Sequence, residues 1–241
     1  MADLNSLWDL DDPRASETRF RLALRAASPR EQHVLMTQLA RAVGLQGRYD
    51  DAWGLLDATT AVDLEVAARL HLERGRILRA RGQRDAARSE LEAAVAASVG
   101  VDEVHIDALH SLALVTAPDE QLALHEEALR IARASTDLRA RDWDASLLHS
   151  IGQAHAGARE WHDALAAFET AWGARERQGH AGRTRTARWT VAWAMRHLDR
   201  VTDALVMQRA IKVELEAIGE HDRAVDEEIM LLEAAQRTSG R

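Results

Sequence analysis

Eleven histidines are the residues of this 241-residue chain best suited to ligating a metal or transferring protons. His125-Glu126 begins like the zinc-protease helix H-E-x-x-H, but position 129 is Leu instead of the second histidine. The motifs G-x-x-x-x-G-K, G-x-S-x-G and G-x-G-x-x-G, which bind phosphates or carry a nucleophile, do not occur in the sequence. These observations predict a chain that is not an enzyme and that has no metal site and no cofactor.

Trp189 and Trp193 are four residues apart, so on a helix both occupy one face. Tryptophan is enriched at the energetic centres of binding surfaces, which makes this pair a candidate for partner contact. Equally, two large rings one turn apart can pack beneath a neighbouring C-terminal helix. Both interpretations stay open at the level of the sequence.

The composition restricts the class of protein. Hydrophobic residues make up 46% of the chain and aromatic residues only 4%, with three prolines, which favours helices over sheets. A formal charge of −8 argues against a dedicated nucleic-acid binder, and the absence of cysteine excludes disulfides and thiolate zinc sites. The acidic N-terminus has no signal-peptide pattern, and no apolar stretch is long enough to span a bilayer. We therefore expect a soluble, cytoplasmic protein.

Helical periodicity, together with the positions of glycine and proline, predicts about twelve helices arranged mainly as antiparallel hairpins. Asp12-Pro13 and Ser28-Pro29 both have the pattern of a helix start, an N-cap followed by proline at the first helical position. The predicted segments are a flexible arm at 1–12, capping helices at 13–27 and 221–237, a frayed tail at 238–241, and hairpins at about 29–60, 62–98, 102–134, 137–178 and 181–218.

Residues 145–178 contain the clearest hairpin. One helical face carries Leu148, Ile151, Gly152 and His155, and the facing stripe of the next helix carries Ala164, Phe168 and Ala171. The small residues allow close approach of the two backbones, and Phe168 fills the space between them. Weaker copies recur along the chain, and the residues that open successive second helices are 34 to 43 positions apart: Ser16, Ala52, Ala87, Gln121, Ala164 and Ala204.

This pattern resembles the tetratricopeptide repeat (TPR), with its signature W-x2-L-G-x2-Y followed by A-x3-F and P. The matching residues are Leu148, Ile151, Gly152, His155, Ala164 and Phe168, whereas the first aromatic residue, the Tyr and the Pro are missing. The resemblance, which extends to free-standing bacterial TPR proteins, implies an all-α, right-handed α-solenoid of stacked hairpins with a concave groove. The third repeat is the most degenerate.

In TPR proteins the first helix of each hairpin lines the groove. Carried over to this sequence, the resemblance implies a partner-binding groove of Arg41, Arg69, Arg76, Arg79, His110, His149, Gln153, Trp189, Trp193 and Arg196. His110 and His149 would then be neighbours, and the four arginines of the first two repeats would form a basic zone. Such a zone suits acidic peptides. The Lys and Asn of the known carboxylate clamp are missing, and paired, solvated arginines are the favoured alternative.

The sequence thus predicts a protein-interaction scaffold that binds a peptide or partner helix, with an acidic segment as one option. Self-association is the first alternative, because a terminal helix at 221–237 carries Ile229, Leu231 and Leu232 and could pair with a second copy. Weak nucleic-acid or nucleotide binding through arginine and tryptophan is the second. The identity of the partner does not follow from the sequence.

Overall fold

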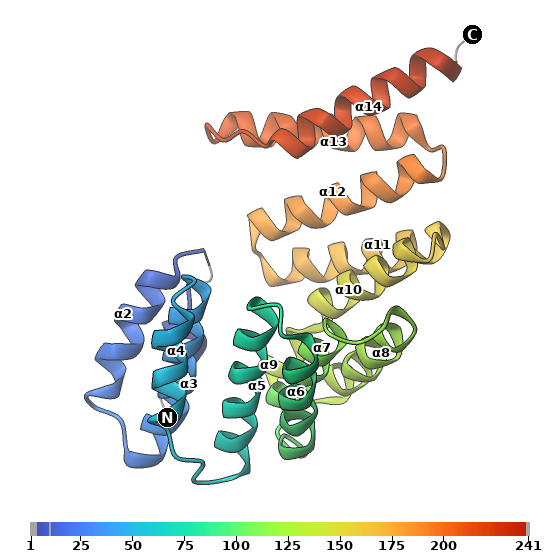
Figure 1. Ribbon diagram of the computed structural model, residues 1–241. Helices are drawn as coiled ribbons and strands as arrows, with labels where there is room; N and C mark the ends of the chain where they lie inside the picture. The colour runs from blue at the N-terminus through green and yellow to red at the C-terminus, as the bar shows by residue number, and fades with distance from the viewer. Residues whose placement is uncertain (1–3, 10, 240–241) are drawn as a thin grey trace. The chain divides into compact units, whose positions relative to one another are not determined.

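The computed structural model describes residues 4–9 and 11–239, apart from the side chains of Asn5 and Ser239, and this part of the chain is helical without a strand (Figure 1). Twelve of its helices have nine or more residues, as expected, and two are single turns. The helices are α1 Leu4–Leu7, α2 Pro13–Leu24, α3 Pro29–Leu45, α4 Tyr49–Asp57, α5 Leu64–Ala80, α6 Arg84–Ala97, α7 Asp102–Ala113, α8 Pro118–Ala134, α9 Leu138–Arg141, α10 Asp144–Gly157, α11 Trp161–Gln178, α12 Ala181–His197, α13 Val201–Ala217 and α14 Arg223–Ser239.

The chain forms two compact units that divide within α8, after Leu124. In the N-terminal unit α3 packs on α2 and α4, α5 packs on α6, and α7 packs on both α5 and α6. In the C-terminal unit α10, α11, α12 and α13 each pack on the next helix in the chain, which ends with α14 (Figure 1). Helices therefore contact their near neighbours in sequence, which is how repeat proteins are built.

Close approach within the hairpins depends on glycine, as the sequence predicts. A Cβ atom added to Gly152 in α10 would lie 2.5 Å from a ring carbon of Phe168 in α11. A Cβ atom at Gly75 in α5 would lie 2.6 Å from Leu91 in α6. Phe168 and Leu91 are completely buried. Each ring or branched side chain thus occupies the space that a side chain on the facing helix would need.

The N-terminal arm differs from the prediction of a flexible segment. Leu4 is buried, and the Trp8 ring packs edge-on against Phe20 with 5.0 Å between ring centroids. Trp8 Nε1 also donates a hydrogen bond to Gln38 Oε1 at 3.0 Å. The described part of the arm is therefore docked on α2 and α3 by apolar burial and by hydrogen bonds of Trp8 with Gln38 and of Asp9 with Ser16. Residues 1–3 and 10 of the predicted arm, and 240–241 of the predicted tail, lie outside the described residues.

Two further predictions are wrong in detail. The first helix of the hairpin expected over 137–178 is interrupted, because α9 ends at Arg141 and α10 begins at Asp144. The frayed tail was expected from residue 238, but α14 continues to Ser239. On α14, Leu232 is fully buried and Ile229 packs against the core, so only Leu231 of the three residues predicted to mediate self-association is exposed.

Candidate functional site

The basic zone predicted from the first two repeats is an ion-pair network inside the N-terminal unit. Arg76 of α5 pairs with Glu73 and with Asp107 of α7, and Arg41 of α3 reaches the same Asp107 at 3.3 Å. Asp107 is only 4% exposed. Burial alone would raise the pKa of Asp107, but the charges of Arg76 and Arg41 outweigh it and lower that pKa below its usual value.

Arg69 belongs to the same kind of network. Only 4% of this residue is exposed, and its guanidinium bonds Glu65 at 3.1 Å and Glu103 of α7 at 2.9 Å. Arg79 is exposed, and it is the one predicted zone residue without a carboxylate partner among the described residues. Carboxylates on the same and neighbouring helices thus pair with three of the four arginines, in line with the favoured alternative of paired arginines, although Arg69 and Arg76 are less exposed than a solvated surface implies. The network also removes the support for nucleic-acid binding through these arginines.

The two predicted groove histidines are in different units. Burial lowers the pKa of His110, in α7, to about 4, and the charge of Asp107 opposes this effect. His149, in α10, packs 5.6 Å from the Phe168 ring, and burial lowers its pKa as well. Both imidazoles therefore favour the neutral form near pH 7. Their proposed proximity stays a prediction.

Four rings of the C-terminal unit, those of Trp161, Trp189, Trp193 and His197, form one cluster. Trp193 meets the Trp161 ring edge-on at 5.1 Å, and the Trp189 ring stacks on Trp193 at 6.4 Å with an angle of 10° between planes. The Trp161 and His197 rings are stacked at 3.8 Å. Both predicted tryptophans are half-buried, so they pack between helices and still present part of each ring to the surface.

The other two predicted groove residues of this unit differ in their surroundings. Gln153 of α10 is exposed. Arg196 of α12 bonds Glu228 of α14 at 2.5 Å, and Glu228 is only 4% exposed. This buried ion pair fixes the side of α14 that faces α12. Arg196 therefore has a structural partner within the chain.

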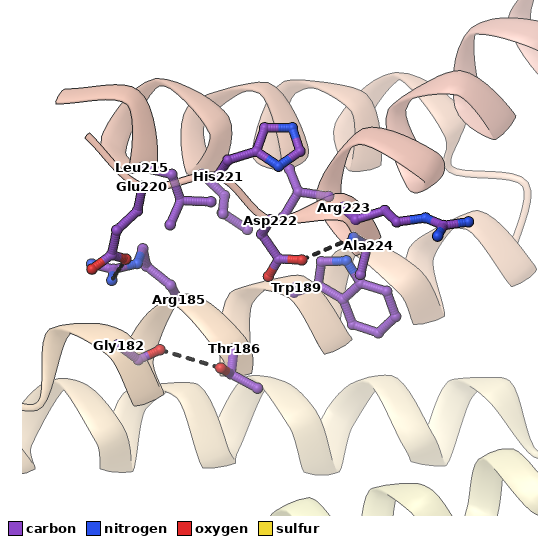
Figure 2. Close-up of a pocket in the computed structure, with 12 residues that line it drawn as sticks. Gly182, Arg185, Thr186, Trp189, Leu215, Glu220, His221, Asp222, Arg223 and Ala224 are labelled. Atoms are coloured by element: carbon purple, nitrogen blue, oxygen red, sulfur yellow. Dashed lines mark hydrogen bonds and ion pairs between the residues drawn. The ribbon is translucent and has the colours of Figure 1, made fainter. Parts of the chain in front are cut away.

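Trp189 also lines a pocket of about 470 Å³, a size in the range of ligand-binding pockets. The pocket lies between the N-terminal half of α12, the end of α13 and the start of α14 (Figure 2). Its apolar lining comes from Trp189, Ile211, Leu215, Ala224 and Val225, and its polar lining from Arg185, Thr186, Glu220, His221, Asp222 and Arg223. An apolar floor with a charged rim suits an amphipathic ligand such as a peptide segment.

Ion pairs hold the segment that closes the pocket. Lys212 of α13 bonds Asp226 of α14 at 2.7 Å, and His221 bonds the same carboxylate at 2.5 Å. The hydrogen bond from Lys212 lowers the pKa of Asp226, and that of Lys212 is raised in return. Arg185 bonds Glu220 at 3.3 Å across the pocket rim. The connection between α13 and α14 is therefore fixed at both ends.

One group of side chains has the geometry of metal ligands. His155, Glu160 and Asp163 place candidate ligand atoms within 4.8 Å of one another at the turn between α10 and α11. His155 Nδ1 is also 2.7 Å from Glu160 Oε2, and both carboxylates belong to the first turn of α11 or its N-cap. Carboxylates are stabilised at that position by the helix dipole, which disfavours a cation. The group is thus explained as a local hydrogen-bonded turn.

Comparison with known proteins identifies the fold. No protein-family model matches the sequence, and no curated protein is recognisably related to it in sequence. Among solved structures, BtubC (BKLC) from P. vanneervenii superimposes with a TM-score of 0.65 at 14% identity, over 92% of this chain and 94% of that chain. The apo quorum sensor NprR from B. thuringiensis gives 0.64 at 14% identity, over 95% of this chain and 64% of NprR. TPR-like repeats of a Podospora anserina kinesin light chain give 0.58 at 18% identity, over 81% and 97%.

The chain has the tetratricopeptide-repeat fold. Within this TPR fold, α10 with α11 and α12 with α13 are hairpins, and α14 packs on α13 and on α12 as the first helix of a further hairpin would. The sequence identified Trp189 but missed the rest of the pocket. Glu220, His221 and Asp222 belong to the connection before α14, and a search confined to first-helix positions passes over connections. No described helix has the length and apolar character needed to cross a membrane.

Proposed function

We propose that this chain is a protein-interaction scaffold that binds a peptide segment in the pocket between α12, α13 and α14. The observation that carries the proposal is the pocket itself, which combines the half-buried Trp189 ring with a charged rim. Tryptophan contributes large contact area with little loss of conformational entropy on binding. NprR, whose structure is also known in complex with its cognate peptide NprX, has the same fold with a TM-score of 0.57 at 14% identity in that complex.

A preformed site is expected to lose little conformational entropy when it binds a peptide. The rim is fixed by the ion pairs of Arg185 with Glu220 and of Lys212 with Asp226, and the floor is fixed by packing of Ile211 and Val225. These groups are engaged with one another, which suits binding better than acid–base chemistry. The proposal therefore takes the chain as a binding protein and not as an enzyme.

The test is selection from a random twelve-residue peptide library displayed on phage, with a pocket-filling variant beside the wild type. Gly182 lines the pocket, and a Cβ atom there would have only Arg185 Nη2 within 4 Å, so Gly182→Leu adds an apolar side chain to the pocket lining at a position with room for its Cβ atom. Gly54→Leu, at an exposed helical glycine of α4 with no atom within 4 Å, is the matched control. We expect wild type and control to enrich peptides and Gly182→Leu to lose at least about tenfold in affinity for them, or about 1.4 kcal/mol. Equal binding by all three proteins would contradict the proposal.

Self-association is a second candidate, because Met230 and Leu231 of α14 are 68% and 53% exposed. Two adjacent apolar side chains on a terminal helix of a repeat array are a surface that a second copy could cover. Sedimentation equilibrium of the wild type and of Leu231→Glu tests it. A dimer that dissociates in the variant would support this candidate, and a wild-type monomer at 100 µM would exclude it.

A further inference from the structure

The charged side chains around the α12–α14 pocket are not equally available to a ligand. Arg185 is bonded to Glu220 at 3.3 Å. Arg223 bonds Glu227 at 2.6 Å, one turn along α14, and its side chain extends away from the pocket (Figure 2). His221 also points away, toward its partner Asp226. The cationic groups of the rim therefore have carboxylate partners already.

Asp222 is the exception among these charged residues. Its carboxylate accepts a hydrogen bond from the Ala224 N–H at 2.8 Å and makes no ion pair within the described part of the chain. The side chain is turned toward the α12 wall of the pocket, which carries Trp189 and Arg185 (Figure 2). Because a carboxylate has about four lone-pair sites, one backbone hydrogen bond leaves most of its accepting capacity for a ligand.

Trp189 supplies the second recognition element. One side of the ring is stacked on Trp193, and the Nε1 atom has no acceptor among the described residues, so packing alone holds the ring in place. The face of an indole carries negative charge and attracts a cation within about 6 Å, more strongly than the rings of Tyr or Phe do. An indole and an unpaired carboxylate in one pocket both favour a positive charge.

From this we infer that the pocket binds an arginine or lysine side chain of the peptide, with the cation between the Asp222 carboxylate and the Trp189 ring. The inference rests on the proposed function and specifies the chemistry of its ligand, in contrast to the acidic segment considered from the sequence. Guanidinium and ammonium groups donate charge-assisted hydrogen bonds to a carboxylate. An acidic side chain at the same position would meet Asp222 and Glu220 as like charges.

The experiment uses the full chain with one substitution and a matched control. Asp222→Asn removes the negative charge but keeps a side-chain oxygen that can accept the Ala224 N–H bond, so α14 retains its start. Asp12→Asn makes the same change at the start of α2, where Asp12 accepts from the N–H groups of Arg14 and Ala15. The probes are twelve-residue peptides selected on the wild type, resynthesised with each Arg or Lys replaced by Gln.

Three results are decisive. We expect the selected peptides to be enriched in Arg or Lys, their Gln versions to bind about tenfold more weakly, and Asp222→Asn to lose a similar factor while Asp12→Asn loses none. Pocket-dependent peptides without that enrichment, bound equally by Asp222→Asn, would overturn the inference and leave the proposed function intact. If Gly182→Leu binds every selected peptide as the wild type does, both the inference and the proposed function fail.

Discussion

At the scale of single residues, Asp107 determines how three helices of the N-terminal unit are joined. Its buried carboxylate bonds Arg76 of α5 and Arg41 of α3 from its position on α7. Removing Asp107 leaves Arg41 without a carboxylate partner among the described residues and leaves Arg76 with Glu73 alone, and a buried charge that is not fully compensated is costly. We expect Asp107→Asn to lower the free energy of unfolding by about 3–5 kcal/mol in urea denaturation.

Asp51→Asn is the control for this prediction. Asp51 bonds Arg48 at 2.9 Å, but 61% of its side chain is exposed, so solvent and salt screen the pair. Its loss should cost about 1 kcal/mol or less. A cost for Asp107→Asn no greater than that of Asp51→Asn would show that the network is not energetically coupled.

His110 makes the stability of the chain depend on pH. Its pKa is lowered from 6.5 to about 4 in the folded state. Burial is the largest cause, the charge of Asp107 acts in the opposite direction, and the charge of Arg76 acts in the same direction as burial. Between pH 6.5 and about 4 the unfolded chain binds a proton that the folded chain does not, so the free energy of unfolding falls as pH is lowered through this window. The maximum contribution is about 3 kcal/mol.

His110→Gln should therefore flatten the stability curve between pH 6.5 and 4, as measured by urea denaturation at several pH values. Buried His149 contributes with the same sign, so some slope remains in the variant. His162→Gln, at an exposed histidine of α11, is the control and should leave the slope unchanged. An unchanged slope in His110→Gln would refute the assignment.

At the scale of the elements, the turns inside four of the hairpins contain a left-handed residue, whereas no described residue in the turn between α7 and α8 is left-handed. Gly47 and Gly82 supply it in the first two hairpins, with φ of 76° and 74°. Arg159 and Asp199 take the same position before α11 and α13, with φ of 62° and 58°. A residue with a Cβ atom pays about 1–2 kcal/mol in this region, whereas glycine does not.

Arg159→Gly should accordingly stabilise the C-terminal unit by about 0.5–1 kcal/mol, since part of the relieved strain is offset by the entropy of glycine in the unfolded chain. Arg159 makes no ion pair in the described part of the chain, so little else is lost. Gly82→Ala is the reciprocal change and should destabilise by a similar amount, because alanine is strained at the left-handed φ of Gly82. No atom lies within 4 Å of the added Cβ atom, so a steric clash does not contribute. Thermal melting of both variants measures the pair of effects.

The hairpins were the part of the fold most accessible from the sequence. The contact of Gly152 with Phe168 is predicted by residue size at fixed spacing, and the structure confirms it; Gly75 and Leu91 make the equivalent contact between α5 and α6. The spacing of 43 residues between Gln121 and Ala164 is the longest between successive repeats, and part of the extra length forms the separate turn α9. Helical periodicity does not distinguish a longer helix from two consecutive ones with the same register.

The candidate site was less accessible for a physical reason. The register of a first helix indicates which side chains share a face, and on that basis Arg41, Arg69 and Arg76 formed a basic zone. The register does not indicate which carboxylates on the next helices reach those guanidinium groups. In the structure Asp107 and Glu103, both on α7, reach them. Likewise, Asp222 lines the same pocket as Trp189 because of the path of the segment between α13 and α14, and that path depends on tertiary packing.

At the scale of the whole molecule, contacts between successive helices make stability a sum of local terms. Helices of each unit pack on their neighbours in sequence, and contacts with the helix after next occur between α3 and α5, α5 and α7, and α12 and α14. In such arrays the ends can unfold while the rest of the array stays folded. The number of helices that a single substitution at one end destabilises can therefore be measured.

Leu232→Ala tests that range, because Leu232 of α14 is fully buried and the change should cost about 2–5 kcal/mol locally. Hydrogen exchange should show lost protection in α14, less in α12 and α13, and none in the helices before Leu124. Leu231→Ala, at the adjacent exposed position, should leave every helix protected. A uniform loss of protection in both units would contradict nearest-neighbour stability and show that the two units fold as one. If the proposed pocket between α12, α13 and α14 binds a peptide, that peptide should restore protection to those three helices in the variant, because a ligand that binds only the folded form stabilises it.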